Sequence, residues 1–83
     1  MSLPRAYLKT KLTETLHSTD NGSITTIEGA YRYMLAMPKE RQMRRAWQRV
    51  CQLILERADS AAVTRQVQLA LILDYRLDLR RTE

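Results

Sequence analysis

Five closely spaced cations are the side chains of this sequence best suited to bind an anionic partner. They are Lys39, Arg41, Arg44, Arg45 and Arg49. At about 100° per residue, Arg41, Arg45 and Arg49 fall on one side of a helix. The opposite side is apolar and carries Met43, Ala46, Trp47, Val50, Ile54 and Ala58. Cations near a helix N-terminus oppose the positive end of the helix dipole, so their concentration here indicates an anionic partner.

Several classes of anionic partner fit these cations. The net charge is +5, from 14 Lys and Arg against 9 Asp and Glu, which favours acidic proteins, nucleic acid or anionic lipid. A helix-turn-helix has a short turn before its recognition helix, often with Gly, whereas Met37-Pro38 is the joint here. Single-strand binders interleave aromatic residues with their cations, whereas Tyr31, Tyr33 and Trp47 lie on other faces or elements. We therefore predict an adaptor or regulator that binds an acidic protein surface. Nucleic-acid phosphates are the alternative partner, and a merely solvated helix face is the structural alternative.

Catalytic chemistry has little support in this sequence. His17 is the single histidine, and neither it nor Cys51 lies in the motif context of a nucleophile and its base. The potential metal ligands follow no recognised spacing. They are His17, Cys51, Asp74 and Asp78. The sequence therefore predicts a non-enzymatic protein with no catalytic residue, no metal site and no cofactor, in which Cys51 is a structural thiol.

Residues 1–24 are ambiguous between a helix and an extended arm. Leucine recurs every four positions within residues 4–17, which suits a helix, but apolar and polar residues also alternate there. Asn21-Gly22 is a sequence that closes hairpins. Only residues 23–26 remain for a second strand, so we favour the helix, with the extended arm as its rival.

Residues 25–83 are predicted to form the helical domain. Its helices are expected at about residues 26–37, 38–58 and 61–75. Thr25 and Glu28 have the spacing of a capping box at the start of the first helix. Pro38 ends that helix and suits the first position of the next, and Ser60 is a candidate cap for the last.

The last predicted helix is apolar on more than one side. Leu69, Ile72 and Leu73 form a second stripe, and a helix of this kind is usually buried all round. In so short a chain we expect this burial to come from a second copy, so we predict a homodimer that associates through these three residues. Asp74 falls in line with the main apolar stripe, which indicates pairing with an arginine. Trp47 is predicted to anchor the core.

The composition indicates one small all-α domain, a bundle of three to four helices. Chains of 83 residues are near the size at which a single core barely suffices. The single cysteine excludes an intramolecular disulfide, which fits the cytoplasm. The longest apolar run, Leu69–Leu73, is too short to cross a bilayer, and residues 1–5 do not resemble a signal peptide.

Overall fold

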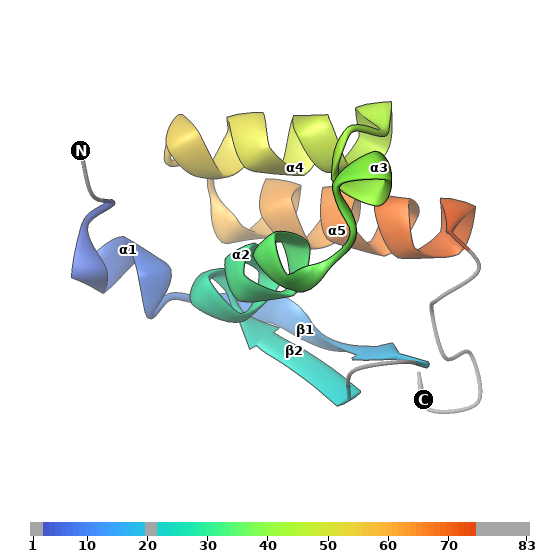
Figure 1. Cartoon of the computed structure of the whole chain (residues 1–83). Helices are drawn as coiled ribbons and strands as arrows, with labels where there is room; N and C mark the ends of the chain where they lie inside the picture. Colours follow the sequence, from blue (N-terminus) through green and yellow to red (C-terminus); the bar gives the residue numbers. More distant parts are fainter. Residues whose placement is uncertain (1–2, 20–21, 75–83) are drawn as a thin grey trace.

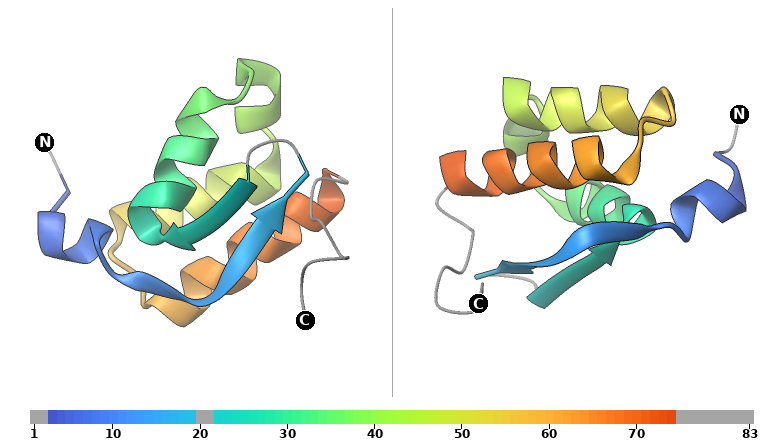
Figure 2. Two further views of the ribbon diagram at one scale, coloured as in Figure 1. Left: turned by 90° about the horizontal axis from the view of Figure 1, so that it is seen from below. Right: turned by 180° about the vertical axis from the view of Figure 1, so that it is seen from behind.

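The computed structural model describes residues 3–19 and 22–74, which form one sheet and five helices (Figure 1). In chain order the elements are α1 (Arg5–Leu8), β1 (Lys11–Ser18), β2 (Gly22–Thr26), α2 (Ile27–Ala36), α3 (Lys39–Gln42), α4 (Arg45–Leu55) and α5 (Ser60–Leu73). The fold is therefore α+β, and the prediction of an all-α bundle is wrong. Figures 1 and 2 show α2 and α5 between the sheet on one side and α4 on the other.

Strands β1 and β2 form an antiparallel hairpin where we expected a helix or an arm. Leu16 pairs with Ile24, and Ser18 pairs with Gly22, whose φ of 74° lies in the left-handed region that glycine tolerates. A four-residue spacing fits a strand as well as a helix, because alternate strand positions share one face. Leu12 and Leu16 are accordingly both buried on the sheet. The intervening threonines also favour a strand, and the pairing with β2 decides between the two structures.

The short second strand suffices because β1 is irregular. Lys11 pairs with Thr26, but the register shifts before Leu16, so the residues between them form a bulge. The bulged segment is hydrogen-bonded directly to α5, because the backbone N–H of Thr13 donates to Oγ1 of Thr64 at 3.0 Å. The hairpin is thus attached to a helix that follows it by some fifty residues in sequence.

Two helices begin one residue away from the predicted caps. The hydroxyl of Thr26, rather than that of Thr25, accepts from the backbone N–H of Gly29 at 3.0 Å and caps α2. Asp59, rather than Ser60, caps α5 with its carboxylate. The predicted positions of both helices are confirmed within two residues over the described part of the chain.

The helix predicted over residues 38–58 is two helices, because the backbone opens at Arg44. Arg44 is extended, with ψ of 145°. The side chain of Gln48 compensates at the break by donating to the carbonyl of Gln42 at 2.9 Å. Neither glycine nor proline marks this point. A tertiary contact accounts for it, since the open conformation brings Arg44 to Asp74 at 2.6 Å.

The end of α4 is a Schellman turn that reverses the chain into α5. The N–H of Ala58 donates to the carbonyl of Leu53 at 2.9 Å, and the N–H of Arg57 donates to that of Ile54 at 3.0 Å. Arg57 occupies the position usually taken by glycine and has φ of 57°. The turn pairs α4 with α5 in an antiparallel arrangement.

The core lies where the sheet, α2, α4 and α5 meet. Its largest fully buried side chains are Trp47, Leu16, Ile27, Ile54, Leu71, Val50, Val63 and Val67. The prediction that Trp47 anchors the core is confirmed. In the part of the chain that the structure describes, no helix is both long enough and apolar enough to cross a membrane.

Candidate functional site

The structure separates Arg41 from the other predicted partner-binding cations. Its side chain is only 12% exposed, and its Nε donates to Oδ2 of Asp74 at 2.5 Å. Its Nη2 donates to the hydroxyl of Tyr33 at 2.8 Å. The guanidinium also lies over the rings of Tyr33 and Trp47, at 5.3 and 5.8 Å from their centroids. Arg41 is therefore part of the protein's interior rather than of a surface for a partner.

Asp74 is the centre of this buried polar cluster. Its side chain is 3% exposed and accepts hydrogen bonds from Arg41, from Arg44 at 2.6 Å and from Nε1 of Trp47 at 2.7 Å. The predicted pairing of Asp74 with an arginine is thereby confirmed. Burial alone would raise the pKa of Asp74, but the hydrogen bonds from Arg41, Trp47 and Arg44 outweigh it, so the pKa lies below its ordinary value.

The cluster connects the end of β1 to the end of α5. The hydroxyl of Tyr33 lies 3.2 Å from Oγ of Ser18, at the end of β1. The chain of contacts therefore runs from Ser18 through Tyr33 and Arg41 to Asp74, at the end of α5. Burial alone would lower the pKa of Arg41. Its hydrogen bonds to Asp74 and Tyr33 raise the pKa by more than burial lowers it, so the net shift is upward. This cluster holds these elements of the fold together. The feature of the sequence that indicated it is Asp74, which falls in line with an apolar stripe.

The remaining predicted cations are exposed. Lys39 lies on α3, and Arg45 and Arg49 lie one turn apart on the outer side of α4. Arg49 donates to the amide oxygen of its neighbour Gln52 at 3.0 Å. Within residues 3–19 and 22–74, no carboxylate lies within salt-bridge distance of Arg45 or Arg49. Arg44 is 59% exposed and shares the carboxylate of Asp74 with Arg41.

The predicted self-association residues are also on the surface. Leu69, Ile72 and Leu73 are 47%, 48% and 58% exposed, so no described element buries this side of α5. Residues three and four apart are neighbours on a helix, and the three side chains therefore make one apolar patch. Such a patch is typical of an interaction surface.

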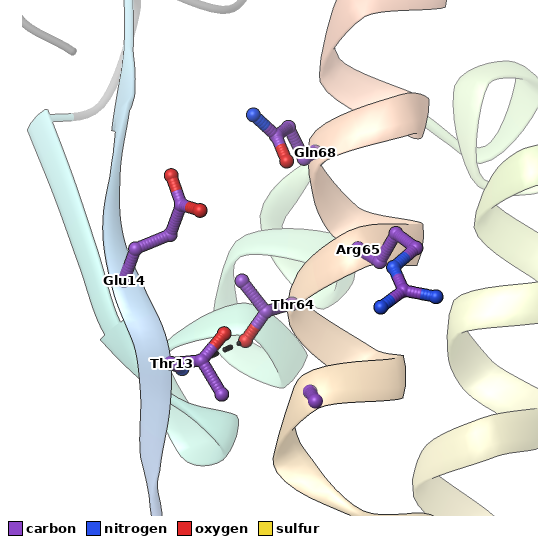
Figure 3. Close-up of a pocket in the computed structure, with 6 residues that line it drawn as sticks. Thr13, Glu14, Thr64, Arg65 and Gln68 are labelled. Atoms are coloured by element: carbon purple, nitrogen blue, oxygen red, sulfur yellow. Dashed lines mark hydrogen bonds between the residues drawn. The ribbon is translucent and has the colours of Figure 1, made fainter.

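A pocket of about 130 Å³ lies between β1 and α5. Figure 3 shows Glu14 and Gln68 pointing into the space between the two elements, above the bond from Thr13 to Thr64. Its lining residues are Thr13, Glu14, Ala61, Thr64, Arg65 and Gln68, a set that offers no nucleophile paired with a base.

The candidate metal ligands do not come together. His17 lies on β1, where its Nδ1 is 3.2 Å from Oγ of Ser23, and Cys51 is half-buried against the core. Asp74 is engaged by its two arginines, and Asp78 lies outside the described residues. Among the described residues, no three His, Cys, Asp or Glu side chains are grouped as metal ligands.

Comparisons with protein-family models, with curated proteins and with solved structures found no match for this chain.

Proposed function

We propose that this chain is a small, non-enzymatic protein-interaction module whose α4 surface binds an acidic protein. The observation that carries the proposal is the exposure of Arg45 and Arg49, one turn apart and without a carboxylate partner in the described part of the chain. Lys39 adds a third exposed cation nearby in sequence. Arg41, which the sequence placed on the same surface, has no part in this proposal, because Asp74 holds it inside the protein.

Two exposed arginines suit the carboxylates of a partner protein. A guanidinium binds a carboxylate through two parallel hydrogen bonds, which gives orientation as well as attraction. Bringing an acidic surface to Arg45 and Arg49 breaks no ion pair within the described residues. The net charge of +5 also steers acidic partners towards the chain.

Nucleic acid is the alternative partner for the same side chains. Phosphates would also bind Arg45 and Arg49. Binding of single strands usually adds stacking of bases on aromatic rings, but Tyr33 and Trp47 are buried. This observation favours the acidic protein.

Self-association through Leu69, Ile72 and Leu73 is a second candidate role, favoured by their joint exposure. Light scattering tests it, since a monomer at micromolar concentration contradicts a dimer. The single cysteine fits a reducing compartment, and we propose the cytoplasm.

Fluorescence anisotropy with labelled poly-L-glutamate and with a labelled DNA duplex tests the proposed function. Replacing Arg45 and Arg49 by Gln should weaken polyglutamate binding by about tenfold and reduce its salt dependence. The matched control replaces Lys9 and Lys11, exposed cations at the other end of the fold, and should change binding little. Equal loss in both variants contradicts a site on α4, and tight binding of the duplex alone supports the alternative.

A further inference from the structure

The α4–α5 pair has one side that no other described element covers. The right-hand view of Figure 2 shows these two antiparallel helices side by side, with α2 and α3 behind them. The sheet packs against the inner side of α5, where Thr13 reaches Thr64. We call the outer side of this pair the α4–α5 seam and define it by Arg45, Ala46 and Arg49 of α4 and by Ala62, Gln66, Leu69 and Leu73 of α5.

One hydrogen bond aligns the two rows of the seam. Nε2 of Gln66 donates to the backbone carbonyl of Ala46 at 3.2 Å. On α4, Arg45 and Arg49 flank Ala46 at one and three residues. On α5, Leu69 and Leu73 follow Gln66 at three and seven residues, which places them on the same side of that helix. Because the helices are antiparallel, Leu69 and Leu73 extend from this bond towards the start of α4, whereas Arg49 extends towards its end, so the leucines and the cations follow one another along the seam.

The seam allows a close approach along its middle. Ala46 and Ala62 are small and half-buried there. The apolar row stands out beside them, since Leu69 and Leu73 are about half exposed. Helices pack at about 8–10 Å between axes when the residues at the contact permit it. A third helix that lies along the seam would thus bury Leu69 and Leu73 against an apolar stripe of that third helix.

The charges of the seam favour an acidic occupant. Arg45 and Arg49 are exposed on α4, and Arg65 is exposed on α5. Glu56 lies at the far end, near the turn, and already accepts a hydrogen bond from Gln52. An acidic helix laid along the seam would pair with these arginines.

We propose that the seam binds an amphipathic helix of a partner protein, with an apolar stripe on Leu69 and Leu73 and, further along the same helix, carboxylates on Arg45 and Arg49. The inference rests on the proposed function and names the form of its acidic partner. Recognition of this kind uses apolar anchors at helical spacing for affinity and flanking charge for orientation.

Two synthetic peptides test this inference on the full chain. One places leucines on one side of a helix and glutamates on the flanks, and the other has the same composition in shuffled order. Binding is measured by fluorescence anisotropy. We expect the ordered peptide to bind at least about tenfold more tightly, because only it presents a stripe to the seam.

Substitutions locate the site. Replacing Leu69 and Leu73 by Ser should reduce binding of the ordered peptide to the level of the shuffled one. The control Leu55→Ser removes an equally exposed leucine from the flank of α4 that faces away from α5, and it should leave binding unchanged. Circular dichroism checks that each variant is folded, and the comparison of the two peptides on the unaltered chain does not depend on any variant.

The outcomes separate this inference from the proposed function. Equal, salt-sensitive binding of both peptides overturns the helical partner but leaves an acidic partner in place. Failure of both peptides and of polyglutamate to bind overturns both proposals. A dimer in light scattering that the Leu69 and Leu73 substitutions dissociate assigns the seam to a second copy and also overturns this inference.

Discussion

Replacing Asp74 by Asn removes one negative charge from the buried end of α5 with almost no change of shape. Three donors converge on that carboxylate: Nε of Arg41, Nη1 of Arg44 and Nε1 of Trp47. An amide keeps one acceptor oxygen but offers an N–H₂ group to the remaining arginine. The variant therefore removes the negative charge of Asp74 from beside the buried guanidinium of Arg41.

The expected loss of stability follows from the exposure of each partner. Arg41 is 12% exposed, and removing one member of a buried ion pair costs about 3–5 kcal/mol. Arg44 is 59% exposed, so water replaces most of what it loses. Because the amide keeps one acceptor oxygen, the loss of stability lies at the lower end of this range, and we expect Asp74→Asn to cost about 3 kcal/mol. A domain of 83 residues is stable by only about 4–12 kcal/mol, so this is a large share.

Urea unfolding followed by circular dichroism and by the fluorescence of Trp47, the single tryptophan, measures this loss. The control Glu28→Gln breaks the exposed pair with Arg32 and should cost less than about 0.5 kcal/mol. The Arg41→Gln variant completes a double-mutant cycle, and the two losses should sum to more than that of the double variant. A loss below about 1 kcal/mol for Asp74→Asn, or strict additivity, would refute the role given to this ion pair.

The other predictions concern pH, a turn and the core. Because the pKa of Asp74 is lower in the folded than in the unfolded chain, its stabilisation is complete above its ordinary value and is lost as pH falls through its folded value. The free energy of unfolding should therefore fall less steeply with decreasing pH in Asp74→Asn than in the parent, and an identical fall in both contradicts this. Arg57→Gly should stabilise the protein by about 0.5–1 kcal/mol, since φ of 57° strains any other residue; a lower melting temperature contradicts it. Trp47→Ala should cost about 3–5 kcal/mol by urea or thermal unfolding, and melting within a few degrees of the parent contradicts the core role.

Helices with clear end signals could be predicted from the sequence. Pro38 stops α2, and the Asp59-Ser60 pair starts α5, so both were found. The break at Arg44 has no such signal, because it depends on a carboxylate thirty residues further along. The hairpin was missed for another reason. Leucines at every fourth position occupy one side of either a helix or a strand, and only the partner strand decides between them.

The candidate site was predictable in part. Periodicity placed Arg45 and Arg49 correctly on the solvent side of α4. It could not separate Arg41 from them, because Arg41 belongs to a different helix whose axis the break redirects. The sequence did contain the signal that one of these cations is buried. An aspartate on the apolar side of α5 requires a buried cation, and Arg41 supplies it.

The bonds that tie β1 and α1 to the second half of the chain determine when synthesis can yield a folded protein. Tyr7 donates to the carbonyl of Ala58, and Thr13 donates to Thr64, each across 51 residues. On a ribosome, the hairpin emerges long before these acceptors, and an isolated two-stranded hairpin is marginally stable. The early strands must therefore wait, with Leu12 and Leu16 uncovered, until α5 has left the exit tunnel. Folding of these residues therefore depends on the emergence of α5 and does not proceed element by element.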